Sequence, residues 1–211
     1  MKHYGDVSVL NGASIEVQEG EVVSVVGASG AGKSTLLHIL GTLDRADQGS
    51  LRINDVDVHK LSAKHIARFR NQSLGFVFQF HNLLPEFSAM ENACMPAMIN
   101  GHTPAEAEAL AMPLFERLRI KDRAKHKPSE LSGGEQQRVA MARALINQPA
   151  IVFADEPSGN LDGENARELH ELLFKLRGEL NQTFIIVTHN PDFAQMADRE
   201  LEIREGKVFG K

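Results

Sequence analysis

One segment constrains this chain more than any other: Gly27-Ala28-Ser29-Gly30-Ala31-Gly32-Lys33-Ser34, which matches the pattern G-x-x-x-x-G-K-[ST]. It directly follows an apolar run at 21–26 and opens a helical pattern that begins with Thr35. In such a strand–loop–helix, glycines let backbone N–H groups point inward at phosphates, and the helix N-terminus adds partial positive charge. Lys33 is then expected to contact the β- and γ-phosphates and Ser34 to ligate Mg²⁺. A glycine-rich turn without a ligand would not need Lys and Ser at these offsets, so the segment predicts a nucleoside triphosphate site.

The apolar runs at 21–26, 74–78, 150–154 and 183–187 are rich in β-branched residues and predict buried strands. Runs that are apolar at nearly every position are typical of a parallel sheet covered on both faces, and the helical patterns between them imply an α/β fold. Residues 201–209 alternate in polarity around a Gly turn, which predicts a hairpin.

The stretch from about 80 to 146 predicts a helical subdomain inserted between core strands. The core then comprises about 1–79 and 147–211, within a single domain of residues 1–211. Thr103-Pro104-Ala105-Glu106 is a capping box with proline at the first helical position. Apolar residues follow it at helical spacing, namely Leu110, Leu114, Phe115 and Leu118.

Two carboxylates, Asp155 and Glu156, directly follow the strand predicted at 150–154. Strand C-termini in open α/β sheets face the ligand crevice. Asp155 is suited to bind Mg²⁺ through water, and Glu156 is suited to act as the general base that orients an attacking water. A solvated acidic loop is the alternative interpretation, and the neighbouring phosphate-loop motif disfavours it.

Gln79 and His189 each follow a predicted strand, so both are expected at the same crevice. A lone Gln or His is usually structural, and only the shared position beyond strand ends favours a functional interpretation. Tyr4 is the only tyrosine of the chain. It is suited to stack on adenine, although an aromatic side chain that covers the core is nearly as good an explanation.

The segment Leu131-Ser132-Gly133-Gly134-Glu135 precedes an amphipathic helix. Ser132 and Glu135 match a capping box, so helix stability alone would explain these two residues. It does not explain two adjacent glycines, each of which costs about 1 kcal/mol against alanine within a helix. Bare backbone at a helix N-terminus favours a second phosphate contact. The apolar side of the helix is formed by Val139, Ala142, Leu145 and Ile146.

The chain resembles the nucleotide-binding domains of ABC transporters over essentially its whole length. The motifs stand in the family's order, namely 27–34, Gln79, Leu131–Glu135, Asp155-Glu156, Ser158–Asp162 and His189. The resemblance implies a P-loop NTPase fold, in its ABC ATPase form, with an inserted helical subdomain and a small antiparallel β part. It also implies ATP hydrolysis with ATP and Mg²⁺, in a homodimer in which Leu131–Glu135 of one subunit contacts the γ-phosphate bound by the other.

The same resemblance implies a role for each matching residue. Catalysis is assigned to Glu156, His189 and Lys33, and Mg²⁺ binding to Ser34, Gln79 and Asp155. Nucleotide contacts are assigned to Tyr4, the residues from Gly27 to Thr35, Gln79, and Ser132, Gly133, Gly134 and Glu135. The chain departs from the family pattern at three places. Tyr4 lies so near the first residue that the strand before it is expected to be short or missing. Glu135 replaces the commoner Gln, and Asn190 follows His189 where Asp is frequent.

The stretch 75–87, continued by Met90-Glu91-Asn92, most resembles the lipoprotein-release group of this family. The macrolide-export and cell-division groups share the 158–162 loop but resemble 79–87 less closely, and they are the alternative. The implied partners are integral membrane permease subunits, and the implied location is peripheral, on the cytoplasmic side of a bacterial inner membrane. Within this group, residues 80–98 are expected to form much of a groove for a cytoplasmic helix of the permease, since methionines and aromatics suit helix-in-groove recognition.

Composition narrows the other function classes. The formal net charge of −5 weighs against a nucleic-acid partner bound through phosphates. A nucleotide-switch protein that acts on nucleic acid would be expected to carry basic surfaces or extra domains, and the sequence shows neither. A small-molecule kinase would not need Leu131–Glu135. Cys94 is the only cysteine, which indicates a reducing compartment. No secretory signal is evident at residues 1–10, and no uncharged apolar run approaches the ~20 residues of a membrane span.

Overall fold

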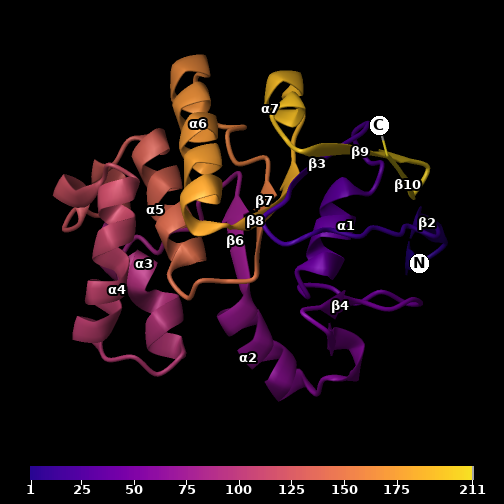
Figure 1. Cartoon of the computed structure of the whole chain (residues 1–211), viewed down its shortest axis with the longest axis horizontal. Coiled ribbons are helices and arrows are strands. Elements are labelled where there is room, and N and C mark those ends of the chain that lie inside the picture. Colours follow the sequence, from indigo (N-terminus) through magenta and orange to yellow (C-terminus); the bar gives the residue numbers. More distant parts are fainter. Residues whose placement is uncertain (211) are drawn as a thin grey trace.

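The computed structural model describes residues 1–210, and its centre is a mixed sheet flanked by helices (Figure 1). The strands are β1 Lys2–Tyr4, β2 Val7–Leu10, β3 Val22–Val26, β4 Arg52–Ile53, β5 Val56–Asp57, β6 Leu74–Phe78, β7 Ile151–Asp155, β8 Thr183–Val187, β9 Arg199–Arg204 and β10 Lys207–Gly210. The α-helices are α1 Lys33–Leu40, α2 Ala63–Ser73, α3 Ala89–Ile99, α4 Pro104–Arg117, α5 Gly133–Leu145, α6 Gly163–Leu180 and α7 Pro191–Gln195. Short 3₁₀ turns lie at Val58–Lys60, Lys121–Arg123 and Pro128–Glu130.

The central sheet has the strand order β10-β9-β3-β8-β7-β6. All neighbouring pairs are parallel except β9 and β10, which pair antiparallel with Ile203 opposite Val208. The α/β fold expected from the sequence is confirmed, and the four expected core strands correspond to β3, β6, β7 and β8. The expected C-terminal hairpin is present, but β9 also pairs in parallel with β3, so the hairpin extends the core sheet.

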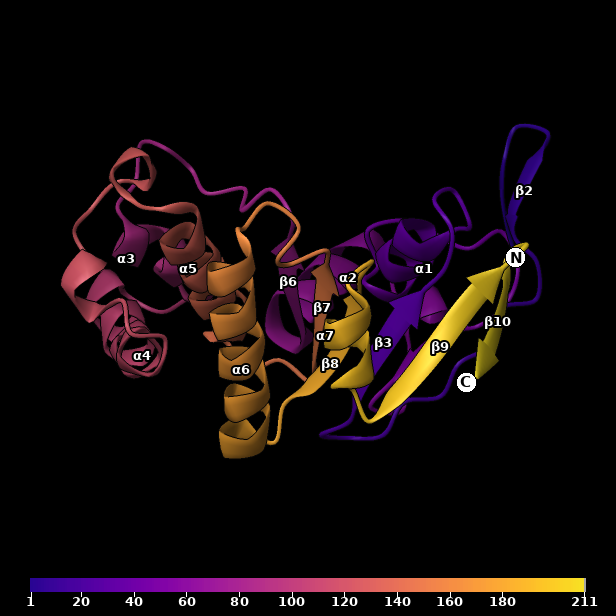
Figure 2. The ribbon, with the colours of Figure 1, turned by 90° about the horizontal axis from the view of Figure 1, so that it is seen from above.

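Alternating side chains bury both faces of the sheet, as expected for strands that are apolar at nearly every position. In β8, Phe184 and Ile186 pack into the cluster formed with α5 and α6, whereas Ile185 and Val187 pack into the cluster formed with α1. Figure 2 shows α6 and α7 on one side of the sheet, with α1 and α2 on the other. The carboxyl ends of the parallel strands therefore meet at one edge, between the helical layers.

Helices α3, α4 and α5 gather at one end of the molecule, beyond β6 (Figures 1 and 2). The predicted capping box of α4 is present, because Thr103 Oγ1 accepts from Glu106 N and a Glu106 carboxylate oxygen accepts from Thr103 N. Of the apolar residues expected on its buried side, Leu114, Phe115 and Leu118 are buried, whereas Leu110 is exposed. The division of the chain at about 80 and 146 stays a prediction.

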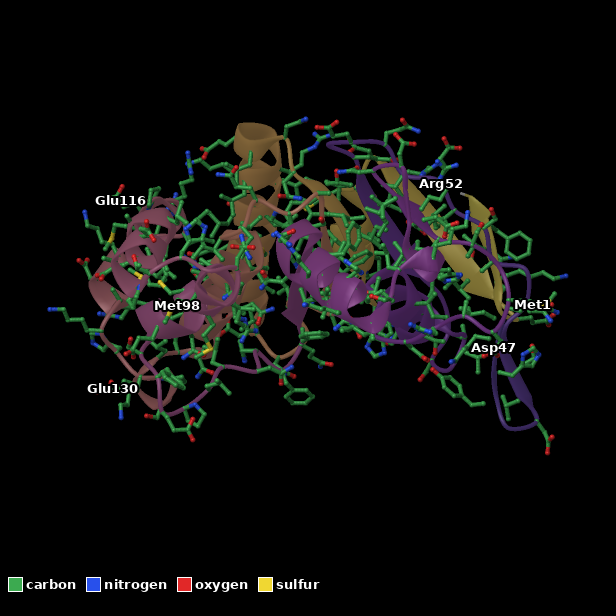
Figure 3. The ribbon with its side chains drawn as sticks, turned by 90° about the horizontal axis from the view of Figure 1, so that it is seen from below. Met1, Asp47, Arg52, Met98, Glu116 and Glu130 are labelled. Atoms are coloured by element: carbon green, nitrogen blue, oxygen red, sulfur yellow. The ribbon has the colours of Figure 1, made fainter. Side chains whose placement is uncertain are left out.

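Two short antiparallel pairs, β1-β2 and β4-β5, form the small β part at the opposite end from α3 and α4. In Figure 3 the labelled Met1 and Asp47 lie at this end, and Met98 and Glu130 lie on the helical half. Among residues 1–210, no helix combines the length and apolarity that crossing a membrane requires.

Candidate active site

The loop between β3 and α1 has the curvature that its sequence predicts. Gly27 and Gly32 have φ of 149° and 104°, a region that L side chains rarely adopt. A Cβ at Gly27 would lie 2.5 Å from the Ile203 carbonyl oxygen, and one at Gly32 would lie 2.9 Å from the Val9 carbonyl oxygen. Both positions therefore need glycine for conformation and for space.

Lys33 is positioned inside this loop. Its side chain is buried, and Nζ donates to the carbonyl oxygens of Gly27 and Ala28, each at 2.9 Å. An ammonium group has three protons to donate. The two carbonyl bonds fix the charge at the first turn of α1, where backbone N–H groups are also available, so this donor set fits a phosphate chain.

The residues expected to bind Mg²⁺ lie at adjacent strand and helix ends. Ser34 Oγ, on α1, is 3.4 Å from Asp155 Oδ1, at the end of β7. A hydroxyl and a carboxylate are the hard oxygen donors that Mg²⁺ prefers, so the pair fits the ion. Within residues 1–210 no cluster of three or more His, Cys, Asp or Glu side chains offers an all-protein metal cage.

Gln79 lines the same cleft as this pair, and its side chain is bonded to the 158–162 loop. Its Nε2 donates to Asn160 Oδ1 at 3.1 Å, and Asn160 Nδ2 donates to the Gln79 carbonyl at 3.0 Å. Gly159 packs so closely on Gln79 that a Cβ there would lie 2.8 Å from Nε2. The structure thus joins the end of β6 to the 158–162 loop, a contact that sequence reasoning missed because a lone Asn in a loop carries no pattern.

Glu156 and His189 are neighbours beyond the ends of β7 and β8. Glu156 Oε2 accepts from the His189 backbone N–H at 3.1 Å, and His189 Nε2 lies 3.4 Å from Glu156 Oε1. Burial raises the pKa of Glu156, and the His189 contacts offset only part of that rise. Oε1 is buried, and among residues 1–210 nothing donates a hydrogen bond to it. A buried carboxylate oxygen with spare acceptor capacity is what a general base needs.

A cleft of about 840 Å³ brings most of the expected residues together. The expected residues that line it are Tyr4, Ser29, Gly30, Gly32, Lys33, Ser34, Thr35, Gln79, Asp155, Glu156 and His189. The other lining residues, which the sequence did not assign to the nucleotide site, are Val9, Phe78, Phe80, Asn82, Gly159 and Val187. A larger cleft of about 1110 Å³ lies against the amino ends of β7 and β8, and its described lining includes no residue of 27–35. Chemistry, and not size, therefore identifies the candidate active site.

The segment Leu131–Glu135 lies outside this cleft. Its capping box is formed, since Ser132 Oγ accepts from Glu135 N at 3.2 Å and Ser132 N donates to Glu135 Oε2 at 2.8 Å. Burial would raise the pKa of Glu135, but hydrogen bonds from the Ser132 backbone and from Arg123 hold it below its usual value. Gly134 is buried, and a Cβ there would lie 3.2 Å from Asn165 Oδ1, so a larger residue would require a small shift of the Asn165 side chain. Ser132 and Gly133 remain exposed at the start of α5.

A buried histidine on α6 contacts the first residue of the loop Ser158–Asp162. His170 Nε2 lies 2.8 Å from Ser158 Oγ, and the His170 ring stacks on Phe193, with centroids 3.6 Å apart. Desolvation lowers the pKa of His170 to about 4, against a smaller opposing effect of Asp192. The imidazole is therefore neutral in the folded protein at neutral pH.

We expect His170 to make the fold sensitive to acid. An imidazole whose folded pKa lies below its unfolded value of ~6.5 binds protons preferentially in the unfolded chain. Its stabilising effect is fully present above pH ~6.5 and is lost as pH falls toward 4, at up to about 1.4 kcal/mol per pH unit. Urea unfolding at pH 7, 6 and 5 measures this slope, and His170→Phe, which keeps a ring against Phe193, is expected to flatten it. Equal slopes in the two proteins would contradict this prediction.

A parallel sheet with a phosphate-binding loop, paired acidic residues at a strand end and an exposed Ser-Gly helix start defines an ATP-binding cassette of the P-loop class. The chain belongs to the ABC transporter family, whose model matches residues 10–159. It is accordingly an ATPase of that family.

The alignments with similar proteins extend over nearly the whole chain. It is 58% identical to the "Lipoprotein-releasing system ATP-binding protein LolD" of Cytophaga hutchinsonii, over 99% of this chain and 95% of that protein. It is 55% identical to the protein of the same name from Porphyromonas gingivalis, over 100% of this chain and 96% of that protein. Among solved structures, the dimeric ATP-binding cassette MJ0796 bound to ADP and Pi is 36% identical, with a TM-score of 0.87 over 96% of this chain and 90% of that one.

Proposed function

We propose that this chain is the ATP-hydrolysing subunit that drives lipoprotein release from a bacterial inner membrane. The observation that carries the proposal is the identity of 58% with a protein named as the ATP-binding protein of such a system, over 99% of this chain and 95% of that protein. The subunit works as a homodimer on the cytoplasmic side of the membrane, together with integral permease subunits similar to LolC and LolE.

Six polar side chains of the cleft have a proposed task in hydrolysis. Lys33 neutralises the β- and γ-phosphates, and Glu156 accepts the proton of the attacking water through its free oxygen. His189, whose side chain is 58% exposed, contacts the γ-phosphate. Ser34, Asp155 and Gln79 hold Mg²⁺, which supplies charge neutralisation on the phosphate oxygens.

The proposed contact with the permease is the exposed apolar surface formed by Phe80, Leu84, Phe87 and Met98. These side chains are 70%, 44%, 41% and 44% exposed. Other members of the 80–98 segment correct the expectation, because Met90 is buried in the core and Leu83 packs against it. Met95 is half-buried. The proposed contact surface therefore includes fewer residues of 80–98 than the sequence suggested.

The backbone around Leu84 and Phe87 is held by hydrogen bonds from a buried side chain. Asn92 is fully buried, accepts from Leu84 N at 2.7 Å, and donates to the carbonyl oxygens of Leu84 and Phe87 at 3.0 and 3.1 Å. A loop fixed from inside, with apolar side chains facing outward, loses little entropy when a partner binds. The loop also continues directly from Gln79, so a partner bound here is connected to the cleft by a short stretch of chain.

We expect Leu84→Glu and Phe87→Glu to abolish copurification with the permease in mild detergent and lipoprotein release in proteoliposomes. Melting temperature and basal ATPase activity should stay close to wild type, because both side chains are exposed. Met196→Glu is the matched control, since Met196 has a similar exposure of 43% and follows α7, outside the 80–98 segment. Met90→Glu is the folding control and should unfold the domain. Normal permease binding by both groove variants would place the contact elsewhere.

A further inference from the structure

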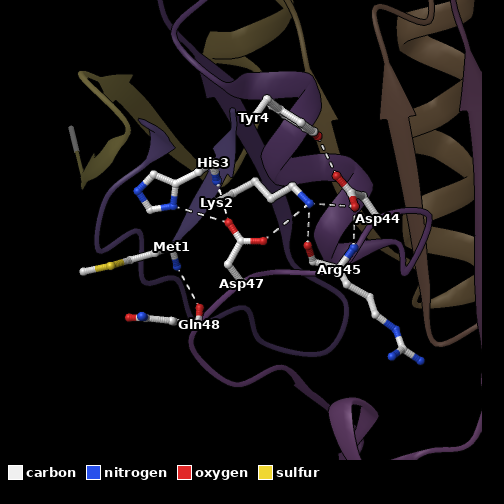
Figure 4. Close-up of polar contacts among 8 residues, drawn as sticks. All are labelled: Met1, Lys2, His3, Tyr4, Asp44, Arg45, Asp47 and Gln48. Carbon is white, nitrogen blue, oxygen red and sulfur yellow. Dashed lines mark hydrogen bonds and ion pairs between the residues drawn. The ribbon is translucent and has the colours of Figure 1, made fainter. Parts of the chain in front are cut away.

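The N-terminal strand β1 is tied to the turn after α1 by a set of polar contacts (Figure 4). Lys2 is only 8% exposed, and its Nζ donates to Asp44 Oδ1 at 2.9 Å and to the Arg45 carbonyl at 2.8 Å. The Tyr4 hydroxyl donates to the other oxygen of the same carboxylate, Asp44 Oδ2, at 2.5 Å. One carboxylate thus holds both side chains, one with each oxygen.

The Asp44 carboxyl is ionised at neutral pH. Hydrogen bonds from Tyr4, then from Lys2, lower the pKa of this carboxyl to about 2. Because a charged acceptor makes stronger hydrogen bonds than a neutral one, the Tyr4 hydroxyl is held firmly.

These contacts fix the orientation of the Tyr4 ring and leave part of the ring exposed to solvent. Lys2 Nζ lies 4.9 Å from the ring centroid, so an ammonium group covers one side of the ring. Tyr4 nevertheless stays 50% exposed and lines the cleft together with Gly30, Lys33 and Thr35. A tyrosine side chain on a short strand has several staggered rotamers available, and the contacts with Asp44 and Lys2 hold Tyr4 in one of them.

We propose that Asp44, with Lys2 as its counter-charge, is a positioning residue that fixes the Tyr4 ring as a stacking platform for the base of the bound nucleotide. The inference rests on the proposed assignment of Tyr4 to the adenine. Asp44 itself does not touch the nucleotide, so its effect acts through the ring alone.

The test compares Asp44→Ala with Asp47→Ala in the full-length protein. Asp47 belongs to the same cluster, accepts from the His3 backbone N–H at 2.7 Å and lies 3.9 Å from Lys2 Nζ, whereas the Tyr4 hydroxyl bonds to Asp44. Asp44→Ala is expected to raise KM for ATP by about three- to tenfold with kcat unchanged, as expected for one side chain that is no longer immobilised. Asp47→Ala should change KM less than about twofold, and affinity for inorganic tripolyphosphate, which has no base, should be the same in both variants. Asp44→Asn, which keeps an acceptor oxygen for Tyr4, should fall in between and serves if the alanine variant melts early.

A double-mutant cycle separates this inference from the assignment of Tyr4. Tyr4→Ala should raise KM by itself, and adding Asp44→Ala should raise it no further, because the two residues act as one unit. If Tyr4→Ala leaves KM unchanged, the proposed base contact is wrong and the inference fails with it. If Tyr4→Ala raises KM but Asp44→Ala does not, or if the two effects multiply, Tyr4 keeps its assignment and the positioning role of Asp44 is overturned.

Discussion

Replacing Glu156 by Gln is expected to leave ATP binding intact and to lower turnover at least a hundredfold, within the ~10²–10⁴ that general acid–base catalysis contributes. An amide has the shape of the carboxylate but cannot accept the proton of the attacking water. The surrounding backbone should not move, since Glu156 N donates to the Val187 carbonyl and Gly159 N donates to the Glu156 carbonyl, each at 2.9 Å. The amide oxygen can still accept from the His189 backbone N–H.

Single-turnover hydrolysis and size exclusion chromatography measure the two parts of this prediction. The variant should form a stable ATP-bound dimer, because the complex that normally decays through hydrolysis persists. Glu171→Gln removes an exposed carboxylate on α6 and is the control, with turnover expected to match wild type. Near wild-type turnover in the Glu156 variant would refute the assignment of the general base.

The parts of the site that the sequence predicts are those fixed by local pattern. The loop at 27–34, the strands before Gln79 and His189, and the Asp155-Glu156 pair each combine a motif with a strand end. Because parallel strands place their carboxyl ends at one edge, local assignment was enough to bring these residues together. The capping boxes of α4 and α5 are local in the same sense, and both are formed.

The parts that the sequence does not predict depend on long-range packing. The parallel pairing of β9 with β3 joins Arg199 to Val23, and nothing in a hairpin pattern indicates it. The contact between Gln79 and Asn160 joins two loops in the same way. Within 80–98, Met90 and Phe87 are both large and apolar, and only the tertiary structure shows that the first is buried and the second exposed.

Substituting Ser132 by Arg is expected to abolish hydrolysis while leaving ATP binding to the isolated subunit unchanged. Ser132 is exposed and lies outside the cleft that holds Lys33, so it cannot assist hydrolysis within its own subunit. In a two-fold symmetric dimer each composite site uses residues of both chains, so one substitution damages both sites. A long cation at the start of α5 would block the surface that we propose contacts the γ-phosphate bound by the other subunit.

The competing explanation, that Ser132 only caps α5, makes a different prediction. Losing an N-cap costs about 1 kcal/mol, which lowers the melting temperature but does not abolish catalysis. Thr103→Arg is the matched control, because Thr103 forms the same capping box on α4, where no dimer contact is proposed. Both variants should lose similar stability, yet only Ser132→Arg should lose hydrolysis and, in the Glu156→Gln background, the ATP-dependent dimer. If the two variants hydrolyse ATP equally well, the segment Leu131–Glu135 is a helix start and has no part in a second subunit's site.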